Sequence, residues 1–282
     1  MRAVISAVLF ISLSAVVKCN CIVDTTSKSI APTPLFIDAT HKTSFYNPTV
    51  QSTNFIFNSG DKVVIACTGA KNAIDKLNVQ EVEVKCESSG KFSANGVQYI
   101  LDDLKCKIWP ESEQRDVGTC CGSFKLVQTA FHVASNYVPI MDTCFDDHTD
   151  RTLYTKMTLS KYAGFQKKVE RPDKFDAGHY FSGDNPDAMY NGQKTKFNYL
   201  GPIKAKEYFG GSNFFNHGHL AAKCDFQFGA QQRSTFWLTN APPQWSSFNS
   251  GNWNNVESAV RKYAATNQKD LVVYTGTHVG TL

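Results

Sequence analysis

The stretch that decides the fold lies at residues 216–257. It opens with NHGHL at 216–220, continues with TFWLTN at 235–240 and PQ at 243–244, and ends with FNSGNWNNVE at 248–257. Apolar residues at 253, 256, 260 and 263 follow one another at helical spacing. We interpret the stretch as a strand–loop–helix unit that presents polar side chains to one site.

Three of these side chains are the types that phosphodiester hydrolysis needs. The reaction requires an activated water, a cation for the developing charge and an acid for the leaving oxygen. His219 suits the base, because imidazole titrates near neutral pH. Asn249 and Glu257 could together hold a hydrated Mg²⁺, because this ion prefers oxygen ligands and keeps most of its waters. Glu257 follows Trp253 by one helical turn, which places it near Asn249.

The pattern from 218 to 257 resembles the signature of the DNA/RNA non-specific endonucleases, which are nucleases of the ββα-metal (His-Me finger) type. Upstream, MDTCFD at 141–146 and TLYT at 152–155 look like the secreted arthropod branch, which includes salivary nucleic-acid-binding proteins of blood-feeding insects. The resemblance covers roughly residues 120–282. It implies an α+β fold, namely a ββα-metal nuclease domain built on a mixed or antiparallel sheet.

The resemblance also implies roles for individual residues. His219 is expected to be the general base, and Asn249 the ligand of Mg²⁺ or Mn²⁺. Glu257 is expected to hold a water of the hydrated ion and to count among the catalytic residues. Asn240 is also expected to be a catalytic residue. Asn216, His217 and Gln244 are expected to bind the substrate.

One position departs from the family pattern. The family usually carries arginine directly before the glycine of its Gly-His pair, whereas this chain has His217. Histidine offers phosphate fewer donors than the planar fork of arginine and is mostly neutral at pH 7. We therefore expect weakened catalysis with binding retained. Residues 176–179, DAGH, look closer to the family letters, but the downstream asparagine, tryptophan and glutamate are missing at the right distances.

Three other interpretations stay open. The first is a catalytically impaired member of the same family that binds nucleic acid. The second is a structural secreted protein, because histidines and Asn-Gly-rich runs are also common in ordinary turns. The third is a zinc site at His217, His219 and Cys224, which we disfavour because Cys224 is expected to form a disulfide.

The chain is expected to be secreted. Residues 1–19 have a basic start and an apolar run, as in a signal peptide, and no later segment is apolar enough to cross a bilayer. Of nine cysteines, eight remain after residue 19, which favours a disulfide framework. Cys120 and Cys121 are adjacent and are expected to bond different partners. Three cysteines lie between residues 60 and 110, so at least one must pair outside that window.

The sequence divides into a small disulfide-linked β-rich module at 20–110, a linker at 111–119 and the nuclease domain at 120–282. Strands are expected at 54–57, 62–67, 81–86, 124–133, 153–159, 235–239 and 271–275, with a hairpin at Asn95-Gly96. A helical segment is expected around 204–208. Residues 274–278 look like the start of a central strand, and the resemblance implies that the domain continues beyond them.

Charge is distributed unevenly between the two halves. Residues 150–282 hold 16 Lys and Arg against 10 Asp and Glu, whereas residues 20–149 hold 11 against 15. A basic second half favours a polyanion partner, namely DNA and RNA without sequence preference. We expect no nucleotide cofactor and no membrane partner, and the sequence leaves the oligomeric state open. The candidate phosphate contacts are Lys161, Lys167, Lys168, Lys194, Lys196, Lys204 and Lys206.

Overall fold

The computed structural model describes residues 19–24, 31–47, 49–51, 54–163, 169, 171–183, 186–211 and 213–278. The predicted signal peptide up to residue 18 lies outside these ranges, as do Lys167 and Lys168. Within them, no helix has the length and apolar character needed to cross a membrane.

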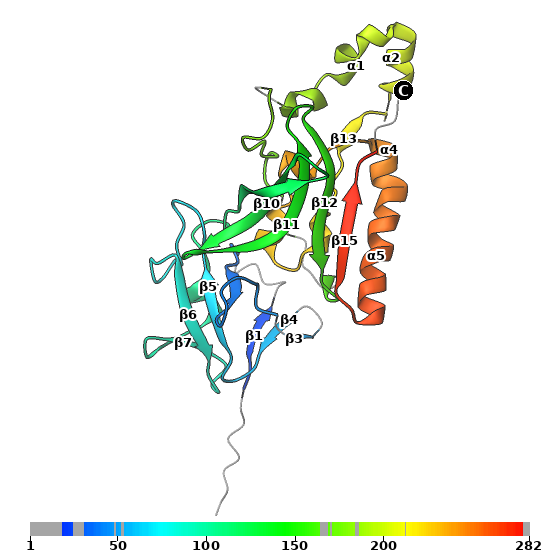
Figure 1. Cartoon of the computed structure of the whole chain (residues 1–282). Coiled ribbons are helices and arrows are strands. Elements are labelled where there is room, and N and C mark those ends of the chain that lie inside the picture. Colours follow the sequence, from blue (N-terminus) through cyan, green and yellow to red (C-terminus); the bar gives the residue numbers. More distant parts are fainter. Residues whose placement is uncertain are drawn as a thin grey trace, which may run out of the picture.

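The first part of the chain forms two antiparallel sheets, with strand orders β1-β4-β3 and β2-β5-β6-β7-β8 (Figure 1). The predicted strands at 54–57, 62–67 and 81–86 and the predicted hairpin are all confirmed. Asn95 and Gly96 both have positive φ, 50° and 79°, as a tight hairpin turn requires. The strands are β1 Cys21–Asp24, β2 Leu35–Asp38, β3 Thr49–Gln51, β4 Asn54–Phe57, β5 Lys62–Ala66, β6 Glu81–Cys86, β7 Phe92–Ala94 and β8 Val97–Tyr99.

The second part is built on a five-stranded antiparallel sheet of order β15-β12-β11-β10-β9. Its strands are β9 Glu113–Cys120, β10 Phe124–Val133, β11 Asn136–Asp146, β12 Arg151–Leu159 and β15 Leu271–Gly276. Residues 113–119 of the predicted linker therefore belong to a sheet strand. The segment expected to start a central strand forms β15, which lies at the edge of the described sheet.

Short helices and one small ribbon complete the second part. They are α1 Gln193–Lys196, α2 Pro202–Tyr208, α3 Gly229–Arg233, α4 Ser246–Phe248 and α5 Asn254–Asn267, with β13 Phe215–His217 and β14 Pro243–Trp245. Helix α5 runs alongside β15 (Figure 1), and its residues Val260 and Ala264 pack with Leu271 and Val273 in the core. Antiparallel sheets with few helices confirm the α+β class.

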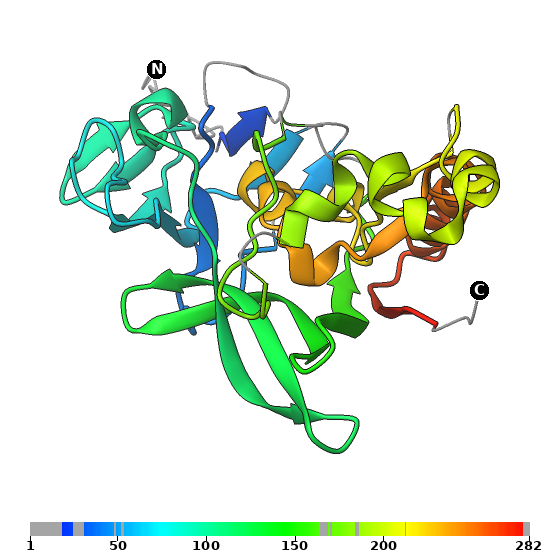
Figure 2. The ribbon, with the colours of Figure 1, turned by 90° about the horizontal axis from the view of Figure 1, so that it is seen from above.

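The two parts of the chain share apolar cores. Ile37 and Val64 of the first part belong to the same buried cluster as Phe131 of the second. Conversely, Phe228 reaches the first cluster, where its ring centroid lies 4.8 Å from that of Phe55. Figure 2 shows the blue strands of the first part directly beside the yellow and orange segments of the second. The division into two domains stays a prediction, and the shared cores describe how such units would pack.

Three disulfides stabilise this arrangement, namely Cys21–Cys86, Cys67–Cys106 and Cys120–Cys144. Cys86 bonds a cysteine outside the 60–110 window, which confirms that part of the cysteine argument. The expectation of a second bond at Cys121 is wrong: this residue is an exposed free cysteine in the β9–β10 turn, with φ 46°. Cys224, which was expected to form a disulfide, belongs to none of the three bonds.

Candidate functional site

A two-stranded ribbon aligns the NHGHL segment with the segment of Gln244. In the antiparallel pair β13–β14, Asn216 lies opposite Gln244 and His217 lies opposite Pro243. Gly218 follows directly, and a Cβ atom there would lie 2.5 Å from the Cβ of Gln244. Only glycine lets the two segments approach this closely. The ribbon thus gathers the three predicted substrate-binding residues on neighbouring positions.

Asn240 fixes the loop that carries His219. Its side-chain oxygen accepts a hydrogen bond from the backbone nitrogen of Ala221 at 2.9 Å. Its side-chain nitrogen donates to the carbonyl oxygens of Ala221 and Thr235, both at 3.0 Å. The residue is completely buried. Both ends of its amide are therefore used by backbone, and Asn240 orders the loop rather than facing a substrate.

The predicted metal ligand and the predicted carboxylate lie on one distorted helical segment. Asn249 begins a π-helical turn, Asn249–Trp253, in which Gly251 departs from helical geometry, with φ −104° and ψ −107°. Helix α5 continues directly from this turn and carries Glu257. The indole nitrogen of Trp253 donates a hydrogen bond to the carbonyl oxygen of His219 at 3.3 Å. Trp253, midway between Asn249 and Glu257 in sequence, thus anchors this segment to the His219 loop.

The imidazole of His219 lies against aromatic rings. Its centroid is 5.0 Å from the ring of Phe236 and 5.3 Å from that of Phe175. Burial, with smaller contributions from the charges of His217 and Lys223, lowers the pKa of His219 to about 4. Its Nε2 atom is buried and has no hydrogen-bond partner among the described residues. At pH 7 the ring is therefore neutral, with one nitrogen still to be satisfied.

Glu257 belongs to a half-buried group of charges that the sequence argument missed. Arg261 Nη1 lies 2.7 Å from Asp225 Oδ1 and 3.8 Å from Glu257 Oε2. Burial raises the pKa of Glu257 to about 7, and the nearby Asp225 adds to this effect, whereas Arg261 and Trp253 oppose it. The spacing of Glu257 and Arg261, four residues apart on a predicted helix, was the available sequence signal for this pair.

His217 is held by contacts that sequence could not indicate. Its Nε2 lies 2.6 Å from Asp187 Oδ1. The ring is sandwiched between Phe175, with centroids 4.0 Å apart, and Tyr190, with centroids 3.7 Å apart. Asp187 comes from a segment 30 residues upstream. These contacts fix His217 beside the His219 loop and occupy its Nε2, so a phosphate would meet this ring only at Nδ1.

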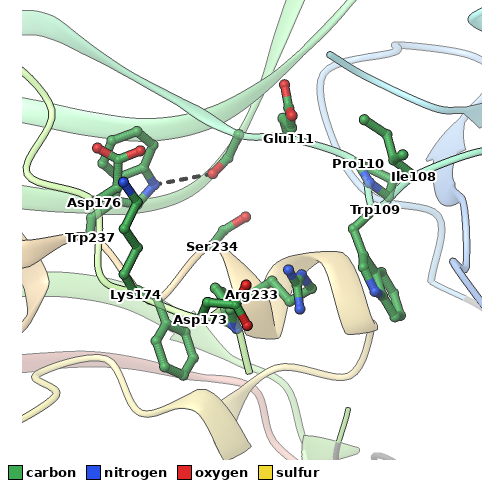
Figure 3. Close-up of a pocket in the computed structure, with 13 residues that line it drawn as sticks. Ile108, Trp109, Pro110, Glu111, Asp173, Lys174, Asp176, Arg233, Ser234 and Trp237 are labelled. Atoms are coloured by element: carbon green, nitrogen blue, oxygen red, sulfur yellow. Dashed lines mark hydrogen bonds between the residues drawn. The ribbon is translucent and has the colours of Figure 1, made fainter. Parts of the chain in front are cut away.

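A hollow of about 630 Å³ has Phe236, which also contacts the ring of His219, among its lining residues. Its other walls can be followed in Figure 3. Figure 3 shows Lys174, Asp176 and Trp237 gathered on one side of it and Trp109 on the opposite side. Asp176 starts the DAGH segment, and its backbone pairs with the segment of Trp237. Its carboxylate accepts a hydrogen bond from Gly178. The DAGH segment is thus joined to this wall of the hollow by its backbone, and its lack of a catalytic role stays a prediction.

The donor set fits a hydrated cation better than a metal held only by protein. Among the described residues, no three His, Cys, Asp or Glu side chains gather closely enough to hold a metal ion. This disfavours the zinc alternative at His217, His219 and Cys224. Mg²⁺ keeps most of its waters and accepts amide and carboxylate oxygens. The Asn249–Glu257 segment offers both kinds of oxygen, and Gln244 Oε1 is a further buried oxygen without a hydrogen-bond partner among the described residues.

The candidate phosphate contacts are spread over the second part of the chain. Lys204 and Lys206 are exposed on α2. Lys161 is half-buried, with its Nζ 5.1 Å from the ring centroid of Tyr162. The structure describes the backbone of α1 but not the side chains of Lys194 and Lys196. Glu207 is exposed on the same helix, and the individual phosphate contacts stay predictions.

Comparisons with known proteins agree with the resemblance. Residues 124–280 match the family model for DNA/RNA non-specific endonucleases. A salivary endonuclease of Lutzomyia longipalpis is 36% identical over 246 residues, which cover 86% of this chain and 56% of that protein. A salivary endonuclease of Culex quinquefasciatus is 25% identical, over 76% of this chain and 63% of that protein.

A third relative, salivary protein Tsal2A of Glossina morsitans morsitans, is 22% identical over 86% of this chain and 62% of that protein. The chain thus spans less than two thirds of the length of each of these relatives. The family model covers more than half of the chain, and the relatives come from the salivary proteins of insects. The chain therefore belongs to the DNA/RNA non-specific endonuclease family, in its salivary arthropod branch.

Proposed function

We propose that this protein is a secreted, metal-dependent endonuclease that hydrolyses DNA and RNA without sequence preference, with His219 as the general base. The observation that carries the proposal is the unpartnered, buried Nε2 of His219. A buried acceptor without a partner costs about 1–3 kcal/mol, and an attacking water would supply that partner. The salivary origin of the relatives and three disulfides support secretion.

The proton transfer follows from the state of the ring. At pH 7 neutral His219, in the tautomer without a proton on Nε2, accepts one proton from water. The resulting hydroxide attacks phosphorus, the bond to the leaving oxygen breaks, and that oxygen takes a proton from solvent. A pKa near 4 makes a weak base, and an anionic phosphate beside the ring raises the pKa of the imidazole during the reaction. Asn240 and Trp253 keep the loop and the helix aligned while this occurs.

The other residues bind and orient the substrate and the ion. Asn249 and Glu257 would hold Mg²⁺ or Mn²⁺, which when bound supplies positive charge that stabilises the transition state. Asn216, His217 and Gln244 would contact the phosphate or its hydration shell from the ribbon β13–β14. Lysines of the basic second half, such as Lys204 and Lys206, would add affinity that does not depend on sequence.

A catalytically impaired nucleic-acid-binding protein is the second candidate. Two observations favour it. His217 replaces the family arginine and already contacts Asp187 at 2.6 Å. Glu257 has a pKa of about 7, so near neutral pH a large share of its side chains is uncharged and holds a cation poorly. Either feature would slow cleavage without removing affinity for nucleic acid.

Incubation of supercoiled plasmid DNA and of a structured RNA with the purified protein in Mg²⁺ tests both candidates. The endonuclease proposal predicts cleavage of both substrates that disappears in EDTA and in His219→Ala. Gel shifts in EDTA measure binding separately, and His219→Ala should retain it. Binding without cleavage by the wild type would favour the impaired relative. Neither binding nor cleavage would overturn both candidates.

A further inference from the structure

A second cavity shares the side chain of Tyr190 with the candidate site. It has a volume of about 640 Å³ and lies between the β11–β12 turn and the 3-10 helix Leu238–Asn240. Most of its walls are apolar. The apolar residues that line it include Phe181, Met189, Tyr190, Leu238, Ala241 and Pro242. Its size and its aromatic and proline walls suit a flat, largely apolar group.

The polar groups of the lining point to what that group must carry. Asp150 accepts hydrogen bonds from the backbone and the hydroxyl of Ser182, at 2.9 and 2.6 Å. Thr152 donates to the carbonyl of Thr239 at 2.5 Å. Arg151 contrasts with both, because its Nε is buried and has no hydrogen-bond partner among the described residues. Its Nη2 lies 3.9 Å from Asp146 Oδ2, and the side chain as a whole is 39% exposed. Arg151 is the cationic side chain of the lining, so an occupant with an acceptor at its edge would gain a charge-assisted hydrogen bond from the guanidinium.

The ring of Tyr190 is the wall shared by the cavity and the candidate site. One of its faces stacks on His217 at 3.7 Å, with an interplanar angle of 25°. Its hydroxyl donates a hydrogen bond to the carbonyl oxygen of Ala241 at 3.1 Å, which fixes the ring in its position against His217 and the cavity. A nucleotide carries its phosphate and its base on opposite sides of the sugar. A strand whose phosphate lies at His217 can therefore place a neighbouring base in the cavity.

We infer that this cavity is a subsite for one unpaired nucleobase, an inference that rests on the proposed nuclease function. The base would stack on aromatic walls, which is sequence-tolerant because every base has a π face. Arg151 would donate to a ring nitrogen or carbonyl oxygen at its edge. Because a duplex must first unpair and unstack the base, single-stranded DNA and RNA bind and react better than duplexes of the same sequence.

The test uses fluorescent single-stranded oligodeoxynucleotides of the shortest length that binds, so that the protein cannot shift along the strand, with one abasic position moved along them. Binding is measured by anisotropy in EDTA, and cleavage in Mg²⁺. At one register the abasic position should weaken binding by about tenfold, because a stacked base contributes at that level. Met189→Trp, which fills the cavity, should weaken binding of the intact strand similarly and remove the abasic effect. Val97→Trp adds the same ring at a residue that is 52% exposed on β8, in the first part of the chain, and is the control.

The outcomes separate this inference from the proposed function. Plasmid cleavage together with equal binding of intact and abasic strands at every register would overturn the subsite and leave the nuclease standing. A register-dependent abasic effect that Met189→Trp removes would support the subsite, even if no substrate were cleaved. An effect that Met189→Trp leaves unchanged would place the base elsewhere and overturn the inference.

Discussion

Glu257→Gln should expose a pH dependence of stability that the wild-type protein conceals. Burial raises the pKa of Glu257 from 4.5 to about 7, so its contribution to stability is present below 4.5 and is lost as pH rises to 7. Burial lowers the pKa of His219 from 6.5 to about 4, so its contribution is present above 6.5 and is lost as pH falls to 4. Between pH 4.5 and 6.5 each contribution changes by about 2 kcal/mol. The two changes have opposite signs and nearly cancel.

Urea unfolding in EDTA at several pH values between 4.5 and 6.5 measures this effect. The free energy of unfolding of Glu257→Gln, relative to wild type, should fall by about 2 kcal/mol as pH is lowered across that range. The side chain of Glu257 is 19% exposed, so solvent screening reduces this value only modestly. Glu207→Gln, at an exposed position of α2, is the control and should run parallel to wild type. Parallel curves for Glu257→Gln would refute the assigned burial of this carboxyl group.

Three further changes test the framework of the site. Arg261→Leu leaves buried Asp225 without its partner and should lower the free energy of unfolding by about 3–5 kcal/mol. Asp225→Asn added to that variant should restore part of the lost stability. A loss below about 1 kcal/mol in urea unfolding would count against the buried pair. In Gly218→Ala the new Cβ would lie 2.5 Å from the Cβ of Gln244, so the free energy of unfolding should fall by about 1–3 kcal/mol in the same assay. An unchanged urea midpoint would contradict the close approach of Gly218 and Gln244. His217→Arg should raise kcat on plasmid DNA by about tenfold or more, because a hydrogen bond from a charged donor contributes about 1.5–3 kcal/mol. Unchanged turnover would show that His217 is not the cause of weak activity.

Local patterns were sufficient where local forces decide the structure. The alternation in Glu81–Cys86 predicts β6, and the Asn95-Gly96 pair predicts the hairpin, because both signals depend on neighbours in sequence. The apolar spacing after Trp253 likewise predicts α5. Helix α5 is also part of the frame of the site, since it carries Glu257.

Residues 235–239 show where local propensity failed. The aromatic and β-branched residues predicted a strand, but the segment makes one isolated bridge at Trp237 and then turns into the 3-10 helix Leu238–Asn240. The hydroxyl of Thr235 donates to the carbonyl of Gln232 at the end of α3 instead of lying on a sheet. The turn brings Asn240 back to the carbonyl of Thr235. Side-chain hydrogen bonds to backbone thus outweighed the strand preference.

The segment predicted as a linker shows a different limit of local patterns. Its polar and charged composition is typical of a loop, yet Glu113–Cys120 forms β9 at the edge of the second sheet. An edge strand with a solvated face tolerates such residues. In the site, the contacts Asp187–His217 and Asp225–Arg261 join residues 30 and 36 positions apart. Only the tertiary fold creates such pairs, so no spacing in the sequence could predict them.

The initial rate of plasmid nicking in Mg²⁺ by His219→Ala, compared with that of His179→Ala, decides whether His219 is the general base. Both variants remove a histidine that follows a glycine, and His179 lies exposed in the DAGH segment. We expect His219→Ala to lose activity by about 10²- to 10⁴-fold, the usual contribution of a general base, and His179→Ala to keep the wild-type rate. Equal rates for His219→Ala and the wild type, or loss of activity in His179→Ala alone, would contradict it.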